Sequence, residues 1–207
     1  MGTDAGPPGE DAPAGGSIRS GQGEHRGADP GQGDRRLDRS NTIRAGVFGI
    51  QDGIVSNFGL IMGVAGAQID PAAVIVSGVA GIVSGSISMG AGEYVSVRTQ
   101  GEMLAAGRAV DEEENVNPYR AAAANGGLFA IGGSVPLFPF FFATGWVAVV
   151  ISVVMSVAAL FVAGAILTRV TRRHPLVSGL RLLVIGGGAG MLGYLLGTLL
   201  GTALGAG

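Results

Sequence analysis

Five apolar segments, each long enough to cross a lipid bilayer, dominate the 207-residue chain. A membrane-spanning helix needs about 20 mainly apolar residues, because each residue adds about 1.5 Å along the helix axis. Charged residues make up only 14% of the sequence, against about 25% in soluble domains. The sequence therefore predicts an all-α integral membrane protein with five transmembrane helices, at residues 43–67, 72–97, 118–142, 146–167 and 176–200.

The first 40 residues have a different composition. They are rich in Gly, Pro, Asp and Arg and contain no aromatic residue. A segment of this kind buries too little apolar surface to offset the entropy lost on ordering. We therefore expect a disordered N-terminal tail at residues 1–40 and a single five-helix membrane domain at residues 41–207.

The basic residues indicate the orientation of the spans. All thirteen are arginines, and they precede the first span or flank the links that follow the second and fourth spans. The links after the first and third spans contain none, and neither does the C-terminus. Because positive charge is concentrated on the cytoplasmic side of membrane proteins, we expect a cytoplasmic N-terminus and a C-terminus outside.

Two carboxylates lie inside the predicted spans. Of the fifteen acidic residues, only Asp52 in the first span and Glu93 in the second are there. An intramembrane charge costs about 2.5–3.5 kcal/mol on insertion scales, and such residues usually have a function. Asp52 lies about 13 Å from the cytoplasmic end of its span and shares a helix face with Ser56. Met89 and Glu93, spaced i, i+4, share a face near the cytoplasmic end of the second span.

The chemistry of these side chains favours a transition-metal cation. Carboxylate oxygens are hard ligands and the Met89 thioether is soft, a combination that suits a first-row divalent ion better than Mg²⁺ or Ca²⁺. Because apolar surroundings disfavour a charged carboxylate, Asp52 is expected to hold a proton when no metal is bound. Metal and proton then compete for the same oxygens, which is a physical basis for antiport. We expect Asp52, Met89 and Glu93 to bind a metal ion as substrate, and no resident cofactor.

Structural roles are the alternatives at each of these positions. Met89 can be a packing residue, because methionine fills irregular gaps. Glu93 can pair with Arg98 at the membrane edge, and Asp52 can pair with an arginine. The acidic run at residues 111–114 is expected to be a solvated cluster.

For the whole chain, the alternative to a transporter is a membrane scaffold or assembly subunit. The last span carries glycines at four-residue spacing, a pattern that suits close helix packing within one chain or between two copies. They are Gly193, Gly197, Gly201 and Gly205. An enzyme is not expected, because no zinc-protease or hydrolase motif is present and both histidines lie outside the spans.

Short motifs follow one another along the chain in a specific order. They are residues 51–57 (QDGIVSN) and 62–67 (MGVAGA) in the first span, 88–97 (SMGAGEYVSV) in the second, and then 117–119, 175–181 and 193–197. Together these motifs resemble the signatures of the vacuolar iron transporter family, over residues 43–201. The resemblance implies a five-helix homodimer that exchanges Fe²⁺ or Mn²⁺ for protons, with Asp52 and Met89 lining an ion path near the dimer interface.

Two features depart from the full pattern of that family. Only residues 98–117 connect the second and third spans, so the acidic cytoplasmic metal-binding domain of the long members is absent, as in the short nodulin-like and bacterial members. The path glutamate that some members carry on the second helix falls at Gly81. Glu93, about three helical turns closer to the cytoplasm, is expected to take its place.

The expected function is therefore export of Fe²⁺ or Mn²⁺ from the cytoplasm by proton antiport, for iron or manganese homeostasis. The expected location is the cell membrane, which the chain crosses several times. The expected partners are the metal ion, protons, the lipid bilayer and a second copy of the chain, and no nucleic acid. The sequence leaves the choice between iron and manganese open.

Overall fold

The structure, a computed structural model, describes residues 30–67, 70–107, 117–171 and 175–205, and all regular structure among them is helical. Each of its five α-helices contains a stretch long and apolar enough to cross a membrane. The helices are α1 (Pro30–Gly66), α2 (Pro71–Ala105), α3 (Pro118–Leu137), α4 (Gly145–Thr171) and α5 (Pro175–Leu204), and the short 3₁₀-helix η1 (Phe138–Phe141) follows α3. This confirms the prediction of an all-α protein with five potential spans.

Two helices extend further than the hydropathy pattern predicts. Helix α1 begins at Pro30, so residues 30–40 are helical and the expected boundary of the disordered tail at residue 40 is wrong. Helix α2 continues through residues 98–105, which we expected to belong to a link. Both extensions are polar but contain no proline after their first residue, and the second is rich in good helix formers. The rest of the expected tail and the acidic run at 111–114 lie outside the described residues.

The starts of α2 and α3 use the same local signal. Asp70 caps α2, and its carboxylate accepts a hydrogen bond from the backbone N–H of Ala72 at 3.0 Å. Asn117 caps α3, and its side-chain oxygen accepts from the backbone N–H groups of Tyr119 and Arg120 at 3.0 and 3.2 Å. In both cases proline follows the cap, at a position where its missing N–H costs nothing. These caps fix where the two helices begin.

Two prolines shape the end of the third span. Helix α3 passes through Pro136 and ends at Leu137, and Pro139 lies in η1. Because Pro139 lacks the N–H that would continue the α-helical ladder, the chain tightens into a 3₁₀ turn. The hydroxyl of Ser152 on α4 donates to the carbonyl of Pro136 at 2.7 Å. The predicted span at 118–142 is therefore α3 together with η1.

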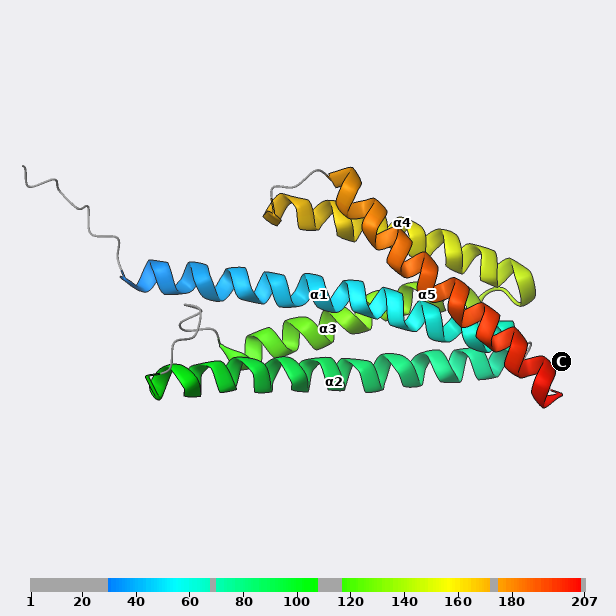
Figure 1. The fold of residues 1–207 in the computed structure, drawn as a ribbon, viewed down its shortest axis with the longest axis horizontal. Coiled ribbons are helices and arrows are strands. Elements are labelled where there is room, and N and C mark those ends of the chain that lie inside the picture. Colours follow the sequence, from blue (N-terminus) through cyan, green and yellow to red (C-terminus); the bar gives the residue numbers. More distant parts are fainter. Residues whose placement is uncertain (1–29, 68–69, 108–116, 172–174, 206–207) are drawn as a thin grey trace, which may run out of the picture.

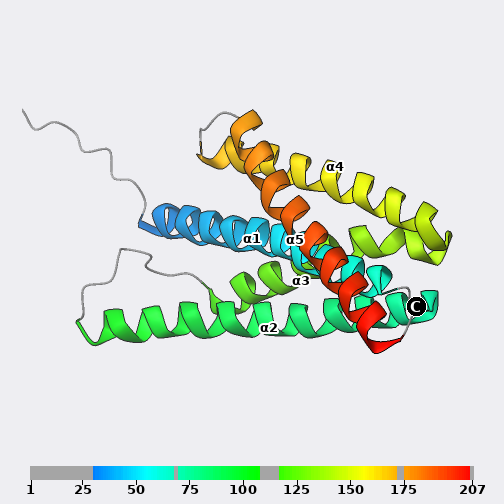
Figure 2. The same ribbon diagram turned by 45° about the vertical axis from the view of Figure 1, so that its right-hand side comes forward.

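Helix α1 lies at the centre of the bundle and contacts each of the other four helices. In Figure 1, α1 and α2 run in opposite directions with α3 packed against both, while α5 crosses over α1 and lies beside α4. The turned view in Figure 2 shows the same crossing of α5 over α1. A buried apolar cluster holds the end of the bundle near the α1–α2 turn: Phe58, Ile61, Met62, Val74, Leu137, Phe140 and Ala148.

Glycines bring the backbones of α1 and α5 into direct contact. A Cβ atom at Gly193 would overlap the carbonyl oxygen of Gly59, and one at Gly197 would overlap that of Gly63. A Cβ at Gly201 would lie 2.8 Å from the carbonyl oxygen of Ala67. The glycine face of the last span therefore packs against the first helix of the same chain. This settles the alternative that the sequence left open.

Substitution at this contact should destabilise the fold. We expect Gly197→Ala to lower the melting temperature, because overpacking a close helix contact costs roughly 1–3 kcal/mol. Gly188→Ala on the same helix is the matched control, since a Cβ at Gly188 has nothing within 4 Å and alanine favours a helix more than glycine does. Thermal unfolding of the detergent-purified protein measures both. Equal melting temperatures for the two variants would contradict the packing described here.

Candidate functional site

Asp52 lies on a face of α1 that the rest of the chain leaves partly open. The adjoining side of the helix is closed, because a Cβ at Gly49 or Gly53 would overlap the backbone of α3. Asp52 itself is half-buried and Ser56 is exposed. The Ser56 hydroxyl donates to the backbone carbonyl of Asp52, as expected for two residues on one face. Phe48, one turn before Asp52, is 57% exposed, so this face combines a carboxylate with uncovered apolar surface.

Glu93 and Met89 lie on the side of α2 that turns toward the bundle. Both are half-buried. The Glu93 carboxylate accepts a hydrogen bond at 3.2 Å from the side-chain amide of Asn125 on α3. Gly90, between them on α2, allows the close approach, because a Cβ there would lie only 3.3 Å from the carbonyl oxygen of Ala122. This part of α2 is therefore held against α3.

Arg98 does not form the ion pair with Glu93 that we considered as an alternative. Its guanidinium Nε instead donates to Glu102 Oε1 at 3.2 Å. The spacing explains this choice, because residues i and i+4 share a helix face, whereas five residues separate Arg98 from Glu93. Both side chains of the Arg98–Glu102 pair are more than half exposed, so the pair contributes little to stability.

The relative levels of the two carboxylates follow from Asn125. Glu93 contacts its amide, and a Cβ at Gly49 would lie 2.7 Å from its side-chain oxygen, so Glu93 lies level with Gly49 on α1. Asp52 is three residues further along α1, a shift of about 4.5 Å. Glu93 is therefore the nearer of the two to the N-terminal end of α1, in the order that the sequence predicts.

The two carboxylates of the expected ligand set belong to different surroundings within one chain. Among the residues that the structure describes, no three or more His, Cys, Asp or Glu side chains lie close enough together to hold a metal ion. Asp52 belongs to the open face of α1, whereas Glu93 is engaged with α3. The roles of Asp52, Met89 and Glu93 as ligands therefore stay predictions.

Sequence reasoning missed two buried amides between the helices. Asn57 and Asn125 are each only 2% exposed. Asn57 donates to the backbone carbonyl of Gly133 at 2.7 Å, and the side-chain oxygen of each asparagine has no hydrogen-bond partner. The prediction started from the carboxylates in the spans and the residues that share a helix face with them, but a buried amide is also costly unless it is hydrogen-bonded. The sequence feature that could have identified both residues is an asparagine inside an apolar span.

The structure also explains why position 81 holds a glycine. A Cβ at this position would lie 2.7 Å from Asn57 Oδ1 and 2.7 Å from Leu60 Cδ2. The volume that a larger side chain would need is thus filled from α1. Some members of the family that the sequence resembles carry a glutamate at this position. Here the amide of Asn57 fills the space that such a side chain would need.

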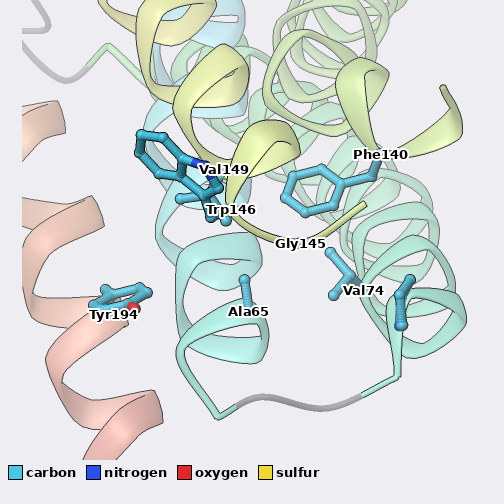
Figure 3. A pocket seen from close by; sticks show the side chains of 8 residues that line it. Ala65, Val74, Phe140, Gly145, Trp146, Val149 and Tyr194 are labelled. Atoms are coloured by element: carbon cyan, nitrogen blue, oxygen red, sulfur yellow. The ribbon is translucent and has the colours of Figure 1, made fainter. Parts of the chain in front are cut away.

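An apolar cavity lies at the other end of the bundle. It has a volume of about 460 Å³ and is lined mainly by apolar and aromatic side chains, among them Phe140, Trp146 and Tyr194. Figure 3 shows these residues grouped around the end of α1 and the start of α4. Ala65 in its wall is about 20 Å along α1 from Asp52. The cavity is therefore separate from the carboxylates.

Comparison with known proteins agrees with the motifs. The model of the VIT family matches residues 43–115 and 103–198. Vacuolar iron transporter homolog 1 of Oryza sativa subsp. japonica is 35% identical over 189 residues, which cover 82% of this chain and 78% of that protein. Vacuolar iron transporter homolog 5 of the same plant is 37% identical over 142 residues, covering 63% and 68%. VIT-like transporter 1b of Glycine max is 34% identical over 165 residues, covering 72% of each chain.

These relatives are named as transporters and not as enzymes, as the sequence predicts. The regions that the family model matches include Asp52, Met89 and Glu93. The chain is a multi-pass membrane protein and belongs to the VIT family.

Proposed function

We propose that this protein transports Fe²⁺ or Mn²⁺ out of the cytoplasm in exchange for protons. The observation that carries the proposal is Asp52, a half-buried carboxylate in the middle of a potential membrane span. Carboxylates at this depth are costly and usually belong to an ion or proton pathway. Relatives named vacuolar iron transporter homologs support iron as one substrate.

The direction of transport rests on the distribution of arginines. The helices alternate in direction, so the N-termini of α1, α3 and α5 and the C-termini of α2 and α4 lie at one end of the bundle (Figure 1). Four arginines lie near this end of their helices: Arg44, Arg98, Arg120 and Arg181. By the positive-inside rule we assign this end to the cytoplasm. We propose the cell membrane as the location, although several relatives carry a vacuolar name.

The ion meets three different ligands along the proposed path. Glu93, nearest the cytoplasmic end, receives it through hard carboxylate oxygens. Met89 adds a soft thioether one turn away on the same helix, which favours a first-row transition metal over Mg²⁺ or Ca²⁺. Asp52 binds the ion at mid-membrane. The metal is cargo on this path, and no resident cofactor is required.

A second copy of the chain completes this path in our proposal. The face of α1 that carries Asp52 also exposes Phe48, and among the described residues of a single chain no group of three or more His, Cys, Asp or Glu side chains surrounds Asp52. A carboxylate turned toward lipid tails would be strongly disfavoured. A homodimer that covers this face would shield Asp52 from lipid and bring two copies of it together.

Proton exchange follows from the chemistry of Asp52. A carboxyl group inside the membrane must be neutralised, either by a covalently bound proton or by a metal ion. The two states exclude each other, because both use the same oxygens. Release of the proton as the metal binds, and uptake of a proton as the metal leaves, couples the two movements in opposite directions.

The scaffold alternative loses its main support. It relied on the glycine face of the last span as a dimerisation surface. Gly193, Gly197 and Gly201 instead pack against α1 of the same chain. These glycines are therefore not free to bind a second copy.

Asp52→Asn should abolish transport. In proteoliposomes with an imposed pH gradient, we expect wild-type protein to take up Fe²⁺ or Mn²⁺ and the variant to fall to the level of empty liposomes, because an amide neither exchanges a proton nor neutralises the metal charge. Asp70→Asn is the matched control. Asp70 caps α2 outside the bundle core, and asparagine is an equally good cap, so this variant should transport normally.

Two results would contradict the proposal in different ways. Folded, dimeric wild-type protein that gives no more flux than empty liposomes would exclude the transporter. Normal gradient-driven flux in Asp52→Asn would keep the transporter but remove Asp52 from the path.

Met89→Leu should change the selectivity between the two metals. The substitution conserves volume but removes the soft ligand, which matters more for Fe²⁺ than for the harder Mn²⁺. We expect the half-saturation concentration for Fe²⁺ to rise roughly tenfold relative to that for Mn²⁺, a difference of about 1.4 kcal/mol in binding. Met62→Leu, a buried methionine of α1, is the control. An unchanged ratio would make Met89 a packing residue.

A further inference from the structure

The side-chain amide of Asn125 lies at the meeting point of α1, α2 and α3. Its nitrogen donates to the Glu93 carboxylate of α2 at 3.2 Å. Its oxygen lies against α1 at Gly49, where a Cβ would be only 2.7 Å away. The residue is 2% exposed. The Asn125 amide therefore donates through Nδ2 to a carboxylate, while its Oδ1, between α1 and α3, has no hydrogen-bond partner.

We propose that Asn125 and Glu93 form an oxygen-ligand site for a divalent cation inside a single protomer, with the Asn125 amide oxygen as a metal ligand. The proposal rests on the transport function above and adds a residue to its cytoplasmic end. It names a ligand outside the three that the sequence predicts, on a helix that carries none of them.

The unpaired oxygen is the first reason for this assignment. Asn125 Oδ1 has no hydrogen-bond partner, and leaving a buried acceptor unpaired costs about 1–3 kcal/mol. An asparagine that served only to fasten α2 to α3 would gain more stability with both ends paired. Buried polar atoms that are left unpaired in a folded protein call for an explanation in terms of function or an additional bound species.

The second reason is the nature of the partner. Asn57 has a similar burial and a similarly unpaired oxygen, but its nitrogen donates to the backbone carbonyl of Gly133, a neutral acceptor with a fixed position. Glu93 is different because its carboxylate binds cations. Once a cation binds there, an N–H donor beside it is repelled and an oxygen is attracted.

Rotation of the amide supplies that oxygen without moving a helix. The terminal torsion of an asparagine side chain is broad and roughly two-fold, so half a turn exchanges Nδ2 and Oδ1. In the metal-free form the amide donates to the ionised carboxylate. In the metal-bound form its oxygen joins the Glu93 oxygens as a ligand, and water completes the coordination.

The ligand set predicts which ions the site prefers. Carboxylate and amide oxygens are hard ligands that suit Mn²⁺, whereas the thioether of Met89 is soft. Since Met89 lies one turn from Glu93 on the same helix, a cation would meet the oxygen site before the sulfur. The oxygen site would then select for charge and the sulfur for metal type.

Mn²⁺ binding to the purified full-length chain tests this assignment. The Asp52→Asn variant is the parent, so that the mid-membrane carboxylate does not contribute, and binding is followed by loss of the free Mn²⁺ signal in electron paramagnetic resonance. We expect the added change Asn125→Leu, which is similar in size but has no polar atom, to raise the Kd for Mn²⁺ roughly 10- to 100-fold. Asn57→Leu in the same parent is the matched control and should leave the Kd unchanged.

Asn125→Leu also separates a ligand from a structural donor. If Asn125 served only to donate to Glu93, its loss would free the Glu93 carboxylate, and the Kd for Mn²⁺ would stay unchanged or fall in the folded variant. That result would overturn the proposal. If Asn125→Leu fails to fold, the smaller Asn125→Ala, which lacks both the oxygen and the N–H, takes its place with the same expected rise in Kd.

The outcome is independent of the transport assay. Mn²⁺ binding that depends on Asn125 and Glu93 in a protein without flux would keep the site and exclude the transporter. Normal flux in wild-type protein, together with Mn²⁺ binding that does not depend on Asn125, would keep the transporter and exclude the site.

Discussion

The structure depends on how closely α1 approaches its neighbours. In a bilayer no hydrophobic force drives helices together, so close packing of small residues has a large share in holding the bundle. Gly49 and Gly53 bring α1 against the backbone of α3, and Gly59 and Gly63 bring it against α5. These two seams fix the rotation of α1 about its axis. Asp52 lies beside the α3 seam and not in it, so the chain covers its side of the helix only in part.

The bundle places its two intramembrane carboxylates in different surroundings. Glu93 is held by a neutral amide from α3 of the same chain, so its environment is built within one protomer. Asp52 has its backbone carbonyl engaged by Ser56, on a face that also carries exposed apolar surface. In our proposal the first carboxylate works within a protomer and the second works where two protomers meet. A fold of this size can therefore use one short helical hairpin for two successive steps.

Hydropathy predicted the number and type of the elements, because an apolar run of about 20 residues has few other solutions in a bilayer. The shared face of Asp52 and Ser56 also followed from helical spacing. Three features could not be predicted. The polar ends of α1 and α2 are helical although nothing apolar marks them. The glycine face of α5 has the same sequence pattern whether its partner is in the same chain or another. The hydrogen bond between Asn125 and Glu93 depends on how α2 and α3 pack, which the spacing along either helix does not give.

The contact between Gly81 and Asn57 has a consequence for how members of such a family can diverge. The amide of Asn57 and the tip of Leu60 fill the volume into which a side chain at position 81 would grow, so an acidic residue there would require both to move aside. A smaller residue at 57 would make room for it. The cost of a change at 81 therefore depends on which residue is at 57.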